Sequence, residues 1–318
     1  MAEINLNQRA VRLVEEMIEL KDELSLKVKK IDDVTVIDGG VDAKGGFKAG
    51  EYFARVCLAD LAEVEITQLQ VDDYRLPAIE VTTDYPFLAC LMSQYAGWKV
   101  SVGDYFTMAS GPGRAVAAKE ELFAEFSYQS QEKQAVLVLE TDSYPTAEVI
   151  NYLSESLQVE KENLYLLIAP TASIVGSIQI NARIVETGMH KIMELGFDIK
   201  QIENGFGISP IAPVAEDDLA AIGRTNDAIL YGGEAYYTVK GDDQELEELI
   251  DEIPACASKD YGKKFIELYQ NYGNFYEIDP LLFSPAQVMI NNLSSGRVFK
   301  AGQIEKDILF DSLLGIEE

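Results

Sequence analysis

The sequence predicts an α+β fold of two subdomains, each a mixed or antiparallel sheet with helices packed against it. Its 318 residues exceed the usual size of one domain, so two subdomains are expected. Residues 134–195 alternate between strand and helix patterns, which is typical of a sheet covered by helices. Residues 286–303 carry two apolar runs around Ser294-Ser295-Gly296, a pattern that predicts a β-hairpin.

Apolar periodicity and turn residues predict the other elements. Helices are expected over residues 4–29, 51–58, 86–95, 145–157, 217–222, 243–253 and 259–272, and at the C-terminal end. Strands are expected over residues 34–37, 63–71, 78–82, 99–102, 134–140, 164–169, 228–231 and 235–239. The Gly- and Pro-rich residues 204–213 are expected to form a hinge, a ligand-facing loop or a plain connection. No long linker marks a border, and we expect the two subdomains to be interleaved in sequence.

Composition excludes several classes of function. The net charge of −28 disfavours nucleic-acid binding, because an acidic protein repels phosphate backbones. With one histidine and three separated cysteines, Cys57, Cys90 and Cys256, no zinc site is expected, and the thiols are predicted to be buried. No apolar run approaches the roughly 20 residues of a membrane span, and the N-terminus has no signal-peptide pattern. We therefore expect a cytoplasmic protein whose chemistry uses carboxylates, arginine, hydroxyls and the backbone.

A polar strip on one predicted helix is the first candidate site. After the strand 164–169 and Pro170, a helix capped by Thr171 or Ser173 is expected to continue to Leu195. Its apolar stripe consists of Val175, Ile178, Ala182, Val185, Met189 and Ile192. The adjoining polar strip consists of Gln179, Arg183, Glu186 and His190. Apolar residues flank this strip on both sides, which indicates the wall of a cleft; the alternative is an exposed Arg183–Glu186 salt bridge.

Three further groups are candidates for ligand binding. Gly111-Pro112-Gly113 forms a tight loop before a helix, where backbone amides and Arg114 could hold an anion; the alternative is an ordinary turn. Gln94 and Tyr95, with Trp98, could line a flat heterocycle, or pack in the core. Asp142 and Ser143 follow a strand and could face the ligand, or cap the next helix.

Four stretches together resemble one known family. They are QINARIVETGMHK, ASGPGRAVA, ILYGGEAYY and SPAQVMINNLSSGRVFKAG, and they are similar to methenyltetrahydromethanopterin cyclohydrolases. The resemblance spans nearly the whole chain in the same order, and the four stretches in register make it specific. One departure is Gly113, where alanine is expected in much of the family.

The resemblance implies a hydrolase of one-carbon metabolism, in methanogenesis or in formaldehyde and methyl oxidation. Such an enzyme interconverts the cyclic 5,10-methenyl pterin and 5-formyltetrahydromethanopterin by adding or removing water. Family members use no metal or prosthetic group, since the C1 carrier is itself the substrate. They form homotrimers of two-domain α+β subunits, with a large pocket between the domains.

The resemblance assigns catalysis to Glu186 and Arg183, and it extends substrate binding to Gln179 and to Ser110, Gly111, Pro112, Gly113 and Arg114. Glu186 is expected to activate water as an acid/base, with Arg183 favouring its ionised form and desolvation opposing it. Arg114 is expected to hold the anionic substrate tail, with Lys44 or Lys48 as alternatives. Gln94, Tyr95, Asp142 and Ser143 complete the expected substrate contacts. Two other functions remain open, a cyclohydrolase acting on a folate-type cation and a non-catalytic pterin carrier.

Overall fold

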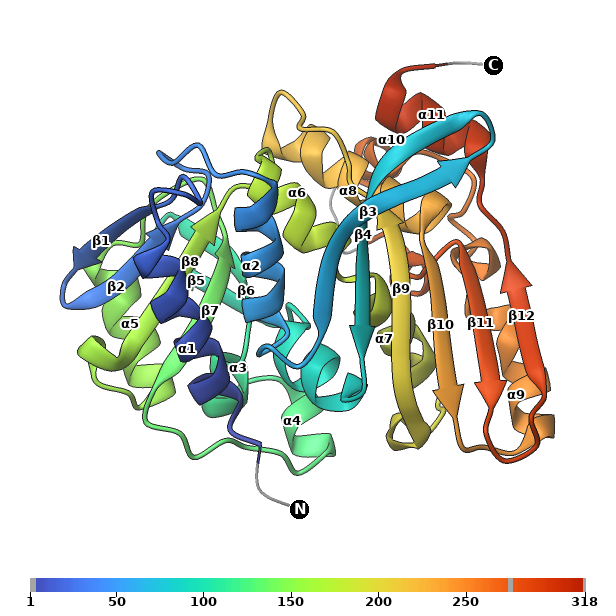
Figure 1. Cartoon of the computed structure of the whole chain (residues 1–318), viewed down its shortest axis with the longest axis horizontal. Coiled ribbons are helices and arrows are strands. Elements are labelled where there is room, and N and C mark those ends of the chain that lie inside the picture. Colours follow the sequence, from blue (N-terminus) through green and yellow to red (C-terminus); the bar gives the residue numbers. More distant parts are fainter. Residues whose placement is uncertain (1–3, 274–276, 317–318) are drawn as a thin grey trace. The chain divides into compact units, whose positions relative to one another are not determined.

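Two six-stranded mixed sheets organise the part of the chain that the computed structural model describes, residues 4–273 and 277–316. The chain divides into two units, and each unit combines two separate segments and contains one of the sheets (Figure 1). Unit 1 consists of Met1–Ala62 and Leu88–Gln179, and unit 2 of Glu63–Phe87 and Ile180–Glu318. The predicted α+β fold, with two mixed sheets and packed helices, is confirmed.

The sheet of unit 1 has a parallel centre and antiparallel edges. Its order is β1 (Lys27–Ile31), β2 (Val34–Asp38), β8 (Leu164–Ala169), β7 (Ala135–Glu140), β6 (Tyr105–Ser110) and β5 (Trp98–Val102). Strands β2, β8 and β7 are parallel, and the other neighbouring pairs are antiparallel. The helices of this unit are α1 (Leu6–Glu19), α2 (Phe47–Cys57), α3 (Gly113–Ala117), α4 (Glu121–Glu125) and α5 (Ala147–Leu157).

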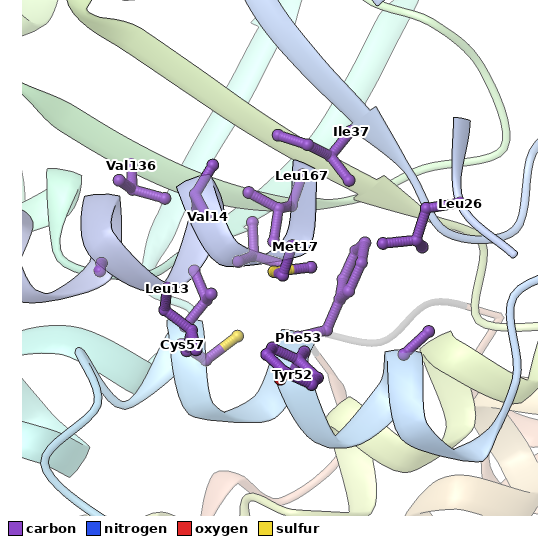
Figure 2. Packing of buried hydrophobic residues seen from close by; sticks show 14 of the residues in the cluster. Leu13, Val14, Met17, Leu26, Ile37, Tyr52, Phe53, Cys57, Val136 and Leu167 are labelled. Carbon is purple, nitrogen blue, oxygen red and sulfur yellow. The ribbon is translucent and has the colours of Figure 1, made fainter. Parts of the chain in front are cut away.

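The two faces of this sheet bury alternate residues of the same strands. Val136 and Val138 of β7 face a core that α1 and α2 cover, whereas Leu137 and Leu139 face a second core that includes α5. Figure 2 shows Met17 of α1 and the residues Tyr52 and Phe53 of α2 packed in the first core. Because successive side chains of a strand point to opposite faces, a continuous apolar strand indicates helices on both sides.

The sheet of unit 2 has one parallel pair, β10 and β11. Its order is β12 (Val298–Gly302), β11 (Gln287–Asn292), β10 (Glu234–Val239), β9 (Ile202–Pro210), β4 (Tyr74–Thr83) and β3 (Glu63–Val71). The hairpin predicted over 286–303 is confirmed as β11 and β12. The helices of this unit are α7 (Ile184–Glu194), α8 (Asp218–Gly232), α9 (Asp243–Leu249), α10 (Phe265–Tyr272) and α11 (Lys306–Leu314).

Several predicted elements have the wrong type or length, among them the helix expected over 259–272, which begins only at Phe265. The helix expected over 4–29 ends at Glu19, and Lys27–Ile31 forms the edge strand β1, because these residues pair with β2. Residues 228–231, expected as a strand, belong to α8. Asp217 is the N-cap of this helix, and its side chain accepts a hydrogen bond from the Ala220 amide at 2.8 Å. A short apolar run alone does not distinguish a buried strand from a buried helix. Strand β6 was not predicted.

The loop expected over 204–213 is instead largely strand β9, which pairs with β4 and β10 in the middle of the sheet. Its glycines have a packing role. A Cβ atom on Gly205 would lie 2.6 Å from Val185 Cγ1, and one on Gly207 would lie 2.8 Å from Ile184 Cγ2. Glycine in a strand permits such a close approach, so these residues allow α7 to lie directly on the sheet.

Other sequence-based expectations have mixed outcomes. Cys57 and Cys90 are buried as predicted, but Cys256 is exposed, so the prediction for this thiol is wrong. In the described residues, no helix has both the length and the apolar character needed to cross a membrane.

Candidate functional site

The predicted long helix after Leu164 is two helices. α6 spans Ile174–Asn181 and α7 begins at Ile184, so the expectation of one continuous helix is wrong. Arg183 is the N-cap of α7, with φ −80° and ψ 6°. The buried Asn181 side chain donates to the Thr225 carbonyl at 2.9 Å and accepts from the Ala212 amide at 2.9 Å. These bonds tie the end of α6 to neighbouring segments of unit 2, at the point where the helix is interrupted.

The interruption changes the surroundings of Glu186. In a continuous helix this carboxylate would lie mid-helix, whereas here it lies in the first turn of α7, three residues after the N-cap. The first backbone N–H groups of a helix have no partner within the helix, and the helix dipole is positive there, so this turn favours a negative charge.

Both the apolar stripe and most of the polar strip are buried. The six stripe residues are 0–1% exposed, as predicted. Gln179, Arg183 and Glu186 are 2%, 9% and 3% exposed, which contradicts the alternative of an exposed surface salt bridge. His190 is partly exposed and lies 3.7 Å from a carboxylate oxygen of Glu194, and burial lowers the pKa of its imidazole.

Within unit 1, the structure brings together several predicted ligand-binding residues. Ser110 Oγ donates to the Gln94 carbonyl at 2.6 Å, and the Gly111 amide donates to the Ser93 carbonyl at 2.9 Å. Ser93 Oγ donates to the Cys57 carbonyl at 2.6 Å, and Cys57 Sγ lies 3.8 Å from Gln179 Oε1. Gln179 therefore belongs to the same cluster as Gln94 and the Ser110 loop.

Gln94 ends an unusual helix. The predicted helix over 86–95 is present, but Phe87–Gln94 is a π-helix, and the Tyr95 amide donates to the Cys90 carbonyl at 2.7 Å. Helices of this type are rare and occur frequently at functional sites. The wider turn directs the Ser93 carbonyl toward the loop after β6, a role for Ser93 that the sequence pattern did not indicate.

The loop of Gly111, Pro112 and Gly113 is closely packed against β7. Gly111 has φ +97°, a conformation that glycine adopts without strain. A Cβ atom on Gly113 would lie 2.9 Å from the Val136 carbonyl oxygen and 2.8 Å from Leu137 Cδ2. An alanine at position 113 would therefore require the loop and β7 to move apart.

Arg114 is fully buried and has its partners within unit 1. Its Nε and Nη2 atoms donate to the Glu120 carboxylate, and its Nη1 donates to the Ser93 carbonyl at 2.9 Å and the Leu91 carbonyl at 3.3 Å. The guanidinium also lies 5.2 Å from the Tyr95 ring centroid. Burial raises the pKa of Glu120, and Arg114 opposes that effect. These contacts favour a structural role for Arg114; its binding of a substrate tail stays a prediction.

Asp142 and Ser143 lie apart from this cluster. They follow the C-terminal end of β7, whereas Gly111 lies beside Val136 near the start of the same strand. Six residues of extended chain span roughly 20 Å, so the two groups lie at opposite ends of this strand. Both residues are exposed. The helix-capping alternative for them is wrong, because Thr146 Oγ1 accepts from the Val149 amide and caps α5.

No three His, Cys, Asp or Glu side chains in residues 4–273 and 277–316 are grouped so that they could hold a metal ion. The side chains of Gln179, Arg183 and Glu186 themselves carry an amide, a guanidinium and a carboxylate. Such groups suit water activation and proton transfer.

The class of protein follows from a family comparison that agrees with this chemistry. The family model described as "Cyclohydrolase (MCH)" matches residues 5–313, and the chain belongs to this family. Individual relatives are named more specifically. The chain is similar to the methenyltetrahydromethanopterin cyclohydrolase of Methanococcoides burtonii, with 43% identity over 97% of this chain and 98% of the relative. It is also 43% identical to the enzyme of that name from Methanocaldococcus jannaschii, over 98% of both chains. The family resemblance noted in the sequence is thereby confirmed.

Proposed function

We propose that the protein is a methenyltetrahydromethanopterin cyclohydrolase, which reversibly hydrolyses the cyclic 5,10-methenyl pterin to 5-formyltetrahydromethanopterin. Family membership and the names of relatives that match almost the whole chain support the reaction. The observation that carries the mechanism is the position of Glu186, a buried carboxylate in the first turn of α7, three residues after the N-cap residue Arg183.

The chemistry requires a positioned and activated water. The methenyl carbon lies between two nitrogens and shares their positive charge, so it is already electrophilic. Glu186 orients a water molecule toward this carbon and accepts its proton as the new C–O bond forms. Arg183 and the start of α7 both favour the negative charge that this base needs before attack.

Hydrolysis is completed when one C–N bond breaks as the C=O bond of the formyl group forms; the added hydroxyl group loses its proton, and the departing nitrogen gains one. In the reverse direction, the protonated Glu186 returns its proton to the leaving hydroxyl group, and water departs as the ring closes. The carboxyl must therefore exchange its proton readily in both directions, since a base held too firmly ionised is a poor acid.

The other parts of the proposal come from the family resemblance and from residue chemistry. Substrate contacts are proposed for Gln179, Gln94, Tyr95, the loop Ser110–Arg114, Asp142 and Ser143. We propose that the protein uses no metal or prosthetic group and that it assembles as a homotrimer.

The variant Glu186→Gln tests the role of the carboxylate. Hydrolysis is followed as the loss of ultraviolet absorbance of the methenyl pterin, and substrate binding is measured separately. We expect turnover to fall by about 10²- to 10⁴-fold while binding persists, because the amide keeps the shape but cannot accept the proton. Glu194→Gln is the matched control, since Glu194 lies on the same helix with its side chain 48% exposed.

Three results would redirect the proposal. Full turnover by Glu186→Gln would exclude Glu186 as the acid/base. Faster hydrolysis of a methenyl folate than of the methenyl pterin would favour the folate-type substrate. Binding of the pterin by the wild-type protein with no absorbance loss would favour a carrier.

A further inference from the structure

The first turn of α7 is attached to the sheet of unit 2 by one buried hydroxyl group. Tyr237, on β10, is 0% exposed, and its hydroxyl donates to the Val185 carbonyl at 2.8 Å. Val185 immediately precedes Glu186 in the sequence. The hydrogen bond therefore reaches the backbone of α7 one residue from the proposed acid/base.

A glycine in α7 leaves room for this hydroxyl. A Cβ atom on Gly188 would lie 2.1 Å from Tyr237 Oη and 3.1 Å from its Cζ. The first distance is far below van der Waals contact and the second is tight, so any side chain at position 188 would displace the phenol. Opposite Tyr237 in the β9–β10 pair lies Gly205, which also has no side chain on that face.

Neighbouring contacts press the same turn against the sheet. Ile184 packs against Gly207 and Gly233, where a Cβ atom would come within 2.8 Å and 2.5 Å of its side chain. The backbone of α7 is thus fixed on both sides of Glu186, by side-chain packing before it and by the Tyr237–Gly188 contact beside it.

We propose that Tyr237 is a positioning residue for Glu186, and that Gly188 is required to admit its hydroxyl. The inference rests on the proposed acid/base function of Glu186. A carboxylate that activates water must be held within a fraction of an ångström of its productive position, and a helix turn tied to a sheet provides that precision. Loss of the tie shifts or loosens the turn and reduces turnover without removing any group that contacts the substrate.

Tyr237→Phe tests this proposal, with Tyr231→Phe as the matched control. Tyr231 is also 0% exposed in unit 2, and its hydroxyl also donates to a backbone carbonyl, that of Lys263. Because each variant removes one hydroxyl–carbonyl bond made by a buried tyrosine, we expect similar falls in melting temperature. Only Tyr237→Phe is expected to lower kcat, by about 10- to 100-fold, because a small misplacement of a catalytic group has a cost of that size.

Two further measurements separate positioning from general stability. KM is expected to stay within about twofold in Tyr237→Phe, since the lost interaction acts in the transition state. Gly188→Ala disturbs the same contact from the helix side, and its effect should be smaller in the Tyr237→Phe background, where the colliding oxygen is absent and the tight contact with Cζ remains. If one variant does not fold, the other still reports on this contact.

The proposal is overturned if Tyr237→Phe retains the turnover of Tyr231→Phe, or if the two effects at Tyr237 and Gly188 multiply independently. Glu186→Gln, assayed in parallel, shows whether the positioning role of Tyr237 or the acid/base role of Glu186 is wrong. If Glu186→Gln is inactive and Tyr237→Phe is fully active, only the positioning role is wrong. If Glu186→Gln is active, the proposed function of Glu186 is wrong.

Discussion

We expect a buried carboxylate in unit 2 to make the stability of the protein depend on pH. Asp227, on α8, is 1% exposed and connects three helices. Its Oδ1 accepts from the Phe265 amide of α10 at 2.8 Å, and its Oδ2 accepts from Ser312 Oγ of α11 at 2.6 Å. Burial raises the pKa of this carboxyl to about 7, although the two hydrogen bonds and the nearby Lys264 oppose the increase.

The sign of the effect follows from the folded and unfolded pKa values. Below the ordinary value of 3.8, Asp227 is protonated in both states and contributes no pH dependence. Between 3.8 and about 7 the unfolded chain ionises first, so stability falls as pH rises. Above about 7 both states are ionised and the loss is complete. The interval of about 3 pH units corresponds to about 4 kcal/mol, at roughly 1.4 kcal/mol per unit.

Asp227→Asn removes the charge and keeps the shape, because its amide oxygen can still accept from Phe265 and its amide nitrogen can donate to Ser312. We expect the variant to gain stability relative to the wild type as pH rises from 5 to 8, by about 1.4 kcal/mol per unit in the steep range. Urea unfolding followed by circular dichroism at several pH values measures this difference.

Asp217→Asn is the matched control for this experiment. It is the same substitution at the exposed N-cap of the same helix, where asparagine caps as well as aspartate. It controls for the effect of an Asp-to-Asn substitution in this helix, because position 217 lies outside the buried contacts that Asp227 makes. A constant difference for Asp227→Asn between pH 5 and 9 would refute the reasoning, since the carboxyl would then titrate alike in both states.

Two further predictions concern buried contacts near the candidate site. Arg114→Ala should lower the free energy of unfolding by about 3–5 kcal/mol, because it leaves the Glu120 carboxylate without its guanidinium partner. In urea unfolding, the double variant Arg114→Ala/Glu120→Gln should recover part of this stability. A large rise in KM without the loss of stability would instead support binding of the substrate tail by Arg114. Gly207→Ala should cost about 1–3 kcal/mol and reduce turnover, because the new Cβ meets Ile184 of α7. Gly46→Ala, where a Cβ atom has no neighbour within 4 Å, is its control, and equal stability of the two variants would contradict the packing argument.

Local sequence patterns were sufficient to predict the elements that bury one regular face. The strands 63–71 and 164–169 and the hairpin near Gly296 were predicted closely, because alternation or a short apolar run between turn residues defines them locally. The stripe from Val175 to Ile192 was predicted to be buried and is buried. Its period of three to four residues survives the interruption between α6 and α7.

Contacts between residues distant in sequence decided the features that local patterns did not predict. Gly205 and Gly207 suggested a loop, yet they lie in the central strand β9. Glycine occurs there because α7 packs so closely on the strand that a Cβ atom would collide with it. Likewise, the Asn181 side chain forms hydrogen bonds with Thr225 and Ala212 where α6 ends, and no local sequence pattern predicts those partners. The sequence by itself thus determined the fold class and named Arg183 and Glu186 through their family resemblance. Only packing between distant segments placed Glu186 in the first turn of a helix, because helix interruptions and close backbone approaches depend on contacts that chain-local periodicity does not encode.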